Sequence, residues 1–263
     1  MRAGTLARSS GYWADVATVA RRAVRSLPRE PEFLAPALII PTFFYAINIG
    51  ALQDVVEGGA PGVFDFKAFQ LPVAIIFAVT GLSRANVLVL DIQGGYFDKL
   101  LVSPIRRSSL LLGLMVADIV LVFSLSLLVV GMGLAVGVRF ETGVAGLLVF
   151  LLIATAWGLA FTGFPYAVAL RTGNPAAVNS AFLIFFPFAF LTSAFLPLEA
   201  LTSWLRAIAR WNPVTYLLAG MRSLISDGWD GLELLKAFGA VAGVGAVSFF
   251  LAFSALRGRV ARG

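Results

Sequence analysis

The chain is dominated by long stretches of apolar residues, which limits the folds open to it. A helix that crosses a bilayer needs about 20 mostly apolar residues. In a membrane, every backbone polar group must be paired within the helix or within a closed barrel. We therefore predict an all-α membrane protein with one transmembrane domain over 1–263. The six predicted spans are 33–52, 70–90, 109–138, 144–169, 177–197 and 232–256.

The composition agrees with this class and excludes several chemistries. Apolar residues make up 59% of the chain and charged residues 13%, with a mean hydropathy of +0.91. Soluble domains contain about 45–50% apolar and about 25% charged residues. Cysteine and histidine are absent, which removes the thiolate nucleophile and the commonest general base and metal ligand. We expect no enzyme, no metal site and no bound cofactor.

The distribution of basic residues predicts the orientation. Lys and Arg concentrate before Phe33, in 91–108 and in the C-terminal tail, and are sparser in 53–69 and 198–231. Positive charge favours the cytoplasmic side. We expect both termini in the cytoplasm, no cleavable signal peptide, and basic segment ends that meet anionic lipid headgroups and not nucleic acid.

Residues 12–27 are expected to form an amphipathic helix that lies in the membrane interface. At 100° per residue, Trp13, Val16, Ala20, Val24 and Leu27 share one stripe, with Asp15, Thr18, Arg22 and Arg25 opposite. Such a helix rests in the headgroup plane with its apolar face inward. The alternative is a disordered basic leader.

Residues 198–231 form a connection that is too long for a turn and too charged to span twice. Asn212-Pro213 separates a helical stripe (Leu201, Trp204, Leu205, Ile208 and Trp211) from a second short apolar stretch. Two half-helices suit an external re-entrant hairpin, and one surface helix with a loop is the alternative. Asp227 and Asp230, in a Gly-Trp turn, are better explained as solvated caps than as an acid/base pair.

Two charged residues fall inside the predicted spans. Arg84 in the second span and Asp118 in the third lie at similar depth, within about one helical turn. A charged side chain inside a membrane is energetically unfavourable unless it is paired or faces water. We therefore predict an Arg84–Asp118 ion pair. The alternative is that Asp118 lines a polar pathway.

The connection 91–113 reads DIQGGYFDKLLVSPIRRSSLLLG. Gly94 and Gly95 permit a sharp turn, the next residues allow one or two helical turns, and Pro104 ends them. A short helix at the cytoplasmic end of a bundle could dock a partner protein, and a solvated connection is the alternative. No phosphate-binding GxxxxGK[ST] loop is present.

This connection, followed by Asp118, resembles the loop after the second helix of ABC-2 type permeases, in particular the daunorubicin-resistance membrane subunits. The later stretches FFPFAFLTSAFLP and WLRAIARWNPVTYLLAGMRSL resemble the last third of the same proteins. The matched positions there are Phe186, Pro187, Ser193, Leu196, Pro197, Asn212, Pro213, Val214, Thr215, Tyr216 and Arg222.

The resemblance implies a six-helix, type V exporter-like permease in a bacterial cell membrane. It implies a separate ABC ATPase that carries ATP and Mg²⁺, and a second permease copy, as homodimer or heterodimer. The implied cytoplasmic coupling segment is 91–105, and the candidate coupling residues are Asp91, Gly94, Gly95, Asp98, Lys99, Leu100, Pro104, Arg106 and Arg107. The candidate substrate path is Phe185, Phe186, Phe190, Thr192, Ser193 and Phe195, and the alternative for its aromatic residues is ordinary lipid-facing or core packing. The external helix motif is Asn212, Pro213, Tyr216 and Arg222.

Three functions follow from these expectations. The first is export of a hydrophobic drug or lipid-like substrate by alternating access, driven by the separate ATPase. The second is export of a polysaccharide or lipid-linked oligosaccharide, which the scarcity of polar groups in the spans disfavours. The third is a membrane assembly subunit without a transport role.

Overall fold

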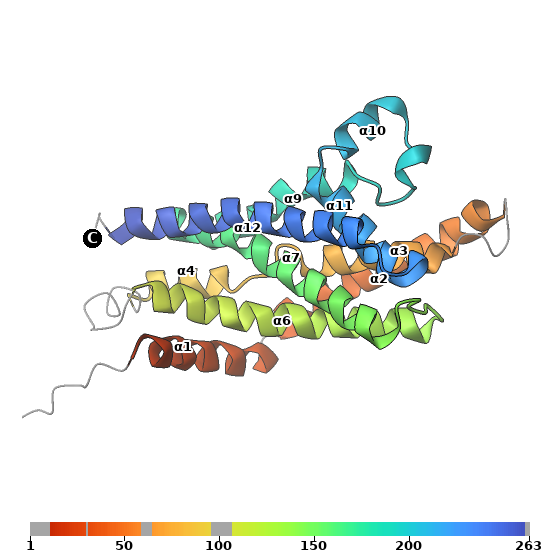
Figure 1. Cartoon of the computed structure of the whole chain (residues 1–263). Helices are drawn as coiled ribbons and strands as arrows, with labels where there is room; N and C mark the ends of the chain where they lie inside the picture. Colours follow the sequence, from red (N-terminus) through yellow and green to blue (C-terminus); the bar gives the residue numbers. More distant parts are fainter. Residues whose placement is uncertain (1–10, 30, 59–64, 96–106, 261–263) are drawn as a thin grey trace, which may run out of the picture.

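The computed structural model describes residues 11–29, 31–58, 65–95 and 107–260. All regular structure in these residues is helical, as predicted (Figure 1). Four helices are long and apolar enough to cross a membrane: α2 (Pro31–Glu57), α6 (Arg107–Ala135), α7 (Gly143–Thr172) and α12 (Gly231–Val260). They cover four of the predicted spans.

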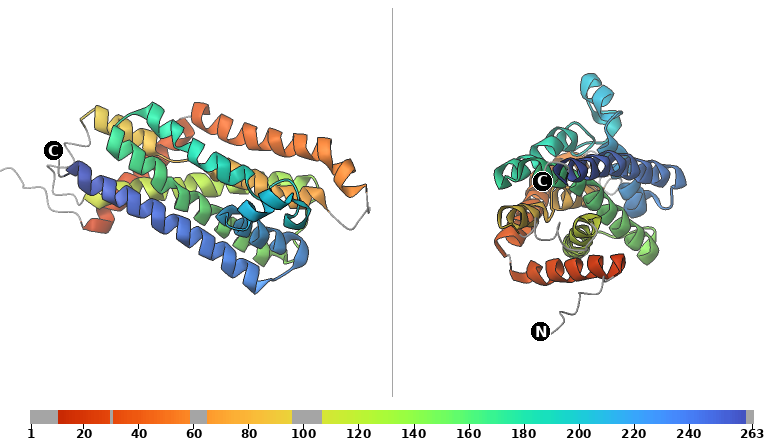
Figure 2. Two further views of the ribbon diagram at one scale, coloured as in Figure 1. Left: turned by 90° about the horizontal axis from the view of Figure 1, so that it is seen from above. Right: turned by 90° about the vertical axis from the view of Figure 1, so that its left-hand side faces the viewer.

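Helix α7 is the centre of the bundle. It packs along α12 and α6 and also contacts α3 (Phe66–Val79) and α4 (Ala85–Gln93) (Figures 1 and 2). Its small residues allow close approach, since a Cβ on Gly163 would lie 2.5 Å from the Ser248 backbone of α12. The Ser248 hydroxyl donates across this contact to the Ala160 carbonyl. Small residues that let backbones approach are typical of helix packing in membranes.

The second predicted span, 70–90, is wrong as one continuous helix. Helix α3 ends at Val79, the chain is extended or turned through Thr80–Arg84, and α4 begins at Ala85. Gly81 has φ +84°, which an L side chain adopts only with strain. The Thr80 hydroxyl donates to the Ile76 carbonyl at 2.6 Å and so competes with continuation of the helix.

The fifth predicted span, 177–197, is also interrupted. The structure has a short α8 (Pro175–Ser180) and then α9 (Phe182–Phe190), and the chain is irregular from Leu191 to Pro197. The irregular part is held by side chains from elsewhere. The Asn212 amide donates to the carbonyls of Phe188 and Leu191 at 2.6 and 2.8 Å, and the Gln70 amide donates to Ala194 at 3.1 Å.

The 198–231 connection contains two helices on either side of Asn212-Pro213. They are α10 (Ser203–Ala209) and α11 (Pro213–Arg222), flanked by a 3₁₀ turn, η2 (Leu198–Ala200), and a π turn, η3 (Ser223–Asp227). Helix α11 packs on α12, while α10 projects from the bundle (Figure 1). Within the predicted apolar stripe, Leu201 is buried, whereas Trp204, Ile208 and Trp211 are exposed. Asp230 caps α12 by accepting from the amides of Leu232 and Glu233.

Helix α1 (Tyr12–Ser26) forms as predicted and lies alongside α6 (Figure 1). Val16, Ala20 and Leu27 of the predicted stripe are buried, together with Asp15 and Ala23, whereas Trp13 is 75% exposed. The helix packs on α6, where Gly113 leaves room for Val19.

Candidate functional site

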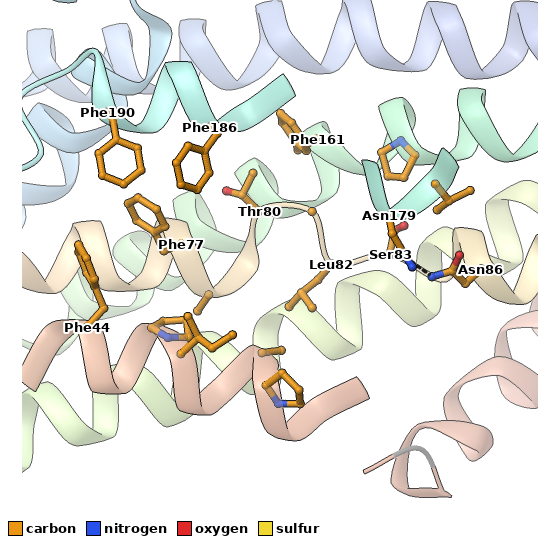
Figure 3. Close-up of a pocket in the computed structure, with 18 residues that line it drawn as sticks. Phe44, Phe77, Thr80, Leu82, Ser83, Asn86, Phe161, Asn179, Phe186 and Phe190 are labelled. Atoms are coloured by element: carbon orange, nitrogen blue, oxygen red, sulfur yellow. Dashed lines mark hydrogen bonds between the residues drawn. The ribbon is translucent and has the colours of Figure 1, made fainter. Parts of the chain in front are cut away.

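An apolar pocket of about 520 Å³ lies beside the break between α3 and α4 (Figure 3). Its walls come from α2, α3, the break itself, α4, α7, α8 and α9. Phenylalanine rings line one part, and the other holds the polar residues Thr80, Ser83, Asn86 and Asn179. The rings belong to Phe44, Phe77, Phe161, Phe186 and Phe190.

The rings are fixed by contacts with one another across different helices. The Phe77 centroid lies 5.5 Å from that of Phe44 on α2 and 5.6 Å from that of Phe190 on α9. Phe186 and Phe190 are 4.8 Å apart. Centroid distances of 4.5–7 Å are typical of favourable aromatic pairs. The pocket wall is therefore a connected aromatic cluster that joins three helices.

The polar part is built from the break and from α8. Trp157 of α7 donates its indole N–H to the Thr80 hydroxyl at 2.8 Å, which fixes the start of the break. The Asn86 amide donates to the Asn179 side-chain oxygen at 2.9 Å and so links α4 to α8. No Lys, Arg, Asp or Glu of the described chain lines the pocket.

Asp118 lies behind the break, and its contacts differ from the predicted ion pair. One carboxylate oxygen accepts from the backbone N–H of Arg84 at 2.7 Å, and the other accepts from the Tyr166 hydroxyl at 2.6 Å. The Arg84 guanidinium donates to the Ser26 hydroxyl at 2.5 Å. Asp118 thus binds the backbone of the residue that precedes α4, and Tyr166, its second partner, was not predicted from the sequence.

The structure divides the predicted substrate path. Phe186 and Phe190 line the pocket, whereas Phe185 is fully buried and stacks edge-on against Phe77 and Phe161. Phe195 packs behind Phe190, with centroids 5.9 Å apart. The other two residues, Thr192 and Ser193, contact the external helix α11 and not the pocket.

The predicted external motif ties α11 to the irregular segment after α9. Asn212 caps α11 through the Val214 amide at 2.9 Å, in addition to its two bonds to carbonyls of the α9 end. Thr192 and Thr215 share a hydroxyl bond at 2.6 Å. Tyr216 donates to the Arg210 carbonyl, and Pro213 is the first residue of α11.

Arg222 joins three elements at the C-terminal end of α11. Its Nε donates to the Phe69 carbonyl at 3.1 Å and its Nη1 to the Ser193 hydroxyl at 3.2 Å. Its guanidinium carbon lies 3.4 Å from the centroid of the Phe69 ring. A cation over an aromatic face is favourable, so this residue fastens α11 to α3 and to the segment after α9.

The predicted coupling segment is described only at its two ends. Asp91 lies on α4, Gly94 ends that helix, and Gly95 follows with φ +68°. Asp91 forms an ion pair with Arg22 of α1 at 2.7 Å. Arg107 begins α6. The other predicted residues lie outside the described ranges: Asp98, Lys99, Leu100, Pro104 and Arg106.

Comparison with known proteins decides the family. The family model described as ABC-2 type transporter matches residues 14–225, which include the pocket, the break and helices α10 and α11. The chain belongs to the ABC-2 type transporter family. With its four long apolar helices, it is therefore a multi-pass membrane protein.

Relatives of this ABC-2 protein are transport permeases. A daunorubicin resistance ABC transporter permease of Streptomyces coeruleorubidus is 25% identical over 80% of this chain and 74% of its own length. A probable doxorubicin resistance ABC transporter permease of Mycobacterium tuberculosis is 25% identical over 73% and 70%. A putative transport permease of Cyanophora paradoxa is 29% identical over 81% and 74%.

Proposed function

We propose that this ABC-2 protein is the permease subunit of an ATP-driven exporter for a hydrophobic drug or lipid-like substrate. The observation that carries the proposal is the aromatic pocket beside the broken helix. Ligand pockets are typically apolar with a few placed polar groups, and this one has both. The names of the Streptomyces and Mycobacterium relatives support a drug-sized substrate.

The proposed topology has six crossings and both termini in the cytoplasm of a bacterial cell. The second crossing consists of α3, the break and α4, and the fifth consists of α8 and α9. Helix α3 then runs inward for about 21 Å, at about 1.5 Å per residue, before the break. The pocket consequently lies in the cytoplasmic half of the membrane, where a substrate of the inner leaflet enters first.

Energy is proposed to come from a separate ABC ATPase that binds ATP and Mg²⁺. The segment 91–107 is the proposed contact, with Asp91, Gly94 and Gly95 at its described end. Helix α4 joins that end directly to the pocket, because Asn86 lines the pocket and Asp91 lies just over one turn further on. A movement of the segment is thereby transmitted to one wall of the pocket. A second permease copy completes the proposed unit.

The test is transport by the whole complex in inside-out vesicles. The permease is co-expressed with its ATPase, and ATP-dependent uptake of daunorubicin, the compound in a relative's name, is followed by fluorescence. Uptake that requires both subunits supports the proposal. ATP-independent behaviour, or failure of the two subunits to co-purify, would overturn it and favour an assembly role.

A further inference from the structure

The buried apolar side chains form two large clusters, and the pocket lies between them. The first, which we call the α3 core, holds buried residues of α2, α3, α9 and α11, including Tyr45, Leu71, Phe185 and Leu217. The second, which we call the α4 core, holds those of α1, α4 and α8, namely Ala23, Ala85, Leu88, Val89, Ile92 and Val178. A small third cluster, which includes Leu82 and Leu121, lies at the break. Helices α4 and α8 are therefore packed apart from α2, α3 and α9, although both groups line the pocket.

The chain is interrupted or weakened at three places where it passes between the two cores beside the pocket. Between α3 and α4 it passes through the break at Thr80–Arg84, and between α8 and α9 it passes through Ala181. Helix α7 is continuous, but Pro165 lies between Phe161 of the α3 core and Tyr166 of the α4 core. Proline has no N–H for the carbonyl four residues earlier and is a common site of helix bending. Helices α6 and α12 pass through both cores without interruption but do not line the pocket.

Two side-chain amides bind α4 to the turn between α7 and α8 and to α8 itself. At the start of α4, the Asn86 amide donates to the Asn179 side-chain oxygen at 2.9 Å (Figure 3). At the end of α4, the Gln93 amide donates to the Gly173 carbonyl at 2.9 Å. The packing is also close there, since a Cβ on Gly173 would lie 3.6 Å from Cγ2 of Ile92. Helix α4 is thus held at both of its ends to the segment that leads into α9.

We propose that Gln93 is a positioning residue that makes α4 and α8 move as one body when the segment 91–107 moves. Both helices belong to the α4 core, and the residues that they contribute to the pocket, Asn86, Val178 and Asn179, shift together against the phenylalanine rings. A displacement of the segment is then transmitted to two walls of the pocket and not only to the wall that α4 forms. Gln93 does not line the pocket and acts through Gly173. This inference rests on the proposed function, since an ATPase must bind the segment to move it.

The hydrogen bond of Gln93 can be removed without disturbing a core. The Gln93 side chain is exposed, and folding exchanges a bond to water for a bond to protein at such a position, so the net contribution to stability is small. Gln93→Met has nearly the same shape but no donor. Gln93→Lys keeps a donor with a similar reach. The two variants form a matched pair that differs in the bond to the Gly173 carbonyl.

The first test follows access to the pocket from α8 in the complex of the full permease with its ATPase in nanodiscs. The chain contains no cysteine, so Val178→Cys, a buried position that lines the pocket, is the one thiol in the permease band of a gel. Its rate of reaction with a small fluorescent maleimide is measured in the resting complex and after trapping with ATP and vanadate. We expect the two rates to differ by about tenfold, because nucleotide converts a minor state of about 10% or less into the major one.

The matched variants are then compared in the Val178→Cys background. Gln93→Met should abolish the difference between the two rates, and Gln93→Lys should retain it, with the same unfolding midpoint for both variants. An equal difference in the Met variant, or no difference with the native Gln93, overturns the proposal. A Met variant that loses the difference together with its unfolding midpoint also overturns it, because Gln93 then has a structural role alone.

The second test replaces the hydrogen bond by a covalent bridge. Gln93→Cys removes the bond, and Thr172→Cys, at the exposed end of α7 beside Gly173, supplies a second thiol outside the pocket. A short bis-methanethiosulfonate that joins them should restore the daunorubicin-stimulated ATP hydrolysis that Gln93→Cys loses, and a reductant should reverse the effect. The same reagent on Gln93→Cys alone is the control. A complete bridge that leaves hydrolysis low shows that α4 and α8 must separate, and overturns the proposal.

The two tests also separate this inference from the proposed function. A Val178→Cys response that depends on Gln93, in a complex that does not take up daunorubicin, refutes the proposed function alone. Daunorubicin uptake by a complex whose Val178→Cys response is the same with and without the Gln93 amide refutes this inference alone.

Discussion

The indole N–H of Trp157 and the hydroxyl of Thr80 form a hydrogen bond at 2.8 Å between α7 and the break that separates α3 from α4. Both residues are buried, and the same hydroxyl donates to the Ile76 carbonyl. The Thr80 hydroxyl thus bonds a carbonyl of the last turn of α3 and also accepts the N–H of the buried indole. This pair is the hydrogen bond that joins the C-terminal end of α3 to α7, whereas the bonds of Gln70 and of the Phe69 carbonyl hold the other end of α3.

Replacing Thr80 by Val should destabilise the permease. The change keeps the shape but leaves the Trp157 N–H without an acceptor, at a cost of about 1–3 kcal/mol. Thr80→Ser retains the hydroxyl and is the matched control. Thermal unfolding in detergent, followed by tryptophan fluorescence, measures the difference. Equal midpoints for the Val and Ser variants would show that the hydrogen bond does not contribute.

Asp118 and Tyr166 should behave as a coupled pair. Tyr166→Phe removes one donor from a buried carboxylate, and loss of a hydrogen bond to a charged group costs about 1.5–3 kcal/mol. In Asp118→Asn the Tyr166 hydroxyl no longer bonds a charged group. The double variant should therefore lose less unfolding free energy than the sum of the two single variants. A double-mutant cycle on unfolding midpoints tests this. Arg84→Gln is the control, because it keeps the backbone N–H of residue 84 and should therefore not rescue Asp118→Asn. If Arg84→Gln does restore the stability of Asp118→Asn, the result favours the ion pair predicted from the sequence.

Removing a ring from the aromatic cluster should weaken the stimulation of ATP hydrolysis by the substrate. Phe77→Leu removes contacts with Phe44, Phe185 and Phe190 at once, and each aromatic pair contributes about 0.5–1.5 kcal/mol. We expect the daunorubicin concentration for half-maximal ATPase stimulation to rise by roughly tenfold or more. Phe123→Leu, on the exposed face of α6, controls for general loss of bulk. The same rise in both variants would argue against the pocket as the binding site.

The ion pair between Arg22 and Asp91 should matter for coupling more than for stability. It is partly exposed, and such pairs contribute about 0–1 kcal/mol to folding. Arg22→Glu should leave the unfolding midpoint nearly unchanged and lower substrate-stimulated ATP hydrolysis, because α1 no longer holds the end of α4. The exchange Arg22→Glu with Asp91→Arg should restore it. A single variant with full stimulation would show that α1 has no part in coupling.

The topology can be tested on a chain that contains no cysteine. Single cysteines at Thr18 on α1 and at Asp227 after α11 are both placed on exposed positions. A membrane-impermeant maleimide added to intact cells should label the second and not the first. Permeabilised cells, in which both should react, supply the control, and the reverse pattern in intact cells would invert the proposed orientation.

The long apolar helices could be predicted from the sequence because length and composition are sufficient for them. The interruptions could not. Residues 70–90 appear as one span in the sequence, but the helix ends at Thr80, whose hydroxyl bonds Trp157 from a distant segment, and at Gly81, whose φ is positive. The helix within 177–197 ends early for a similar reason, because the side-chain amide of Asn212 bonds the carbonyls of Phe188 and Leu191, which lie 24 and 21 residues earlier in the chain.

The same limit applies to the pocket. Phe186 and Phe190 could be selected from an aromatic-rich stretch, but Phe44, Phe77 and Asn86 lie on three helical segments that only folding brings together. A polar Asn within an apolar run was an available signal. Arg84 and Asp118 were correctly placed at one depth by counting residues, yet depth does not reveal whether backbone or side chain makes the contact.

Helix α7 is 30 residues long, as is α12, which packs along it. At about 1.5 Å per residue each measures about 45 Å, against a hydrocarbon core of about 30 Å. Such helices must tilt, extend beyond the hydrocarbon, or thicken the bilayer around them. Residues of α7 line one wall of the pocket and residues of α9 line another, so a change in the tilt of α7 is expected to change the width of the pocket. The length of the lipid chains is therefore expected to affect substrate binding, and we expect this protein to prefer thicker membranes.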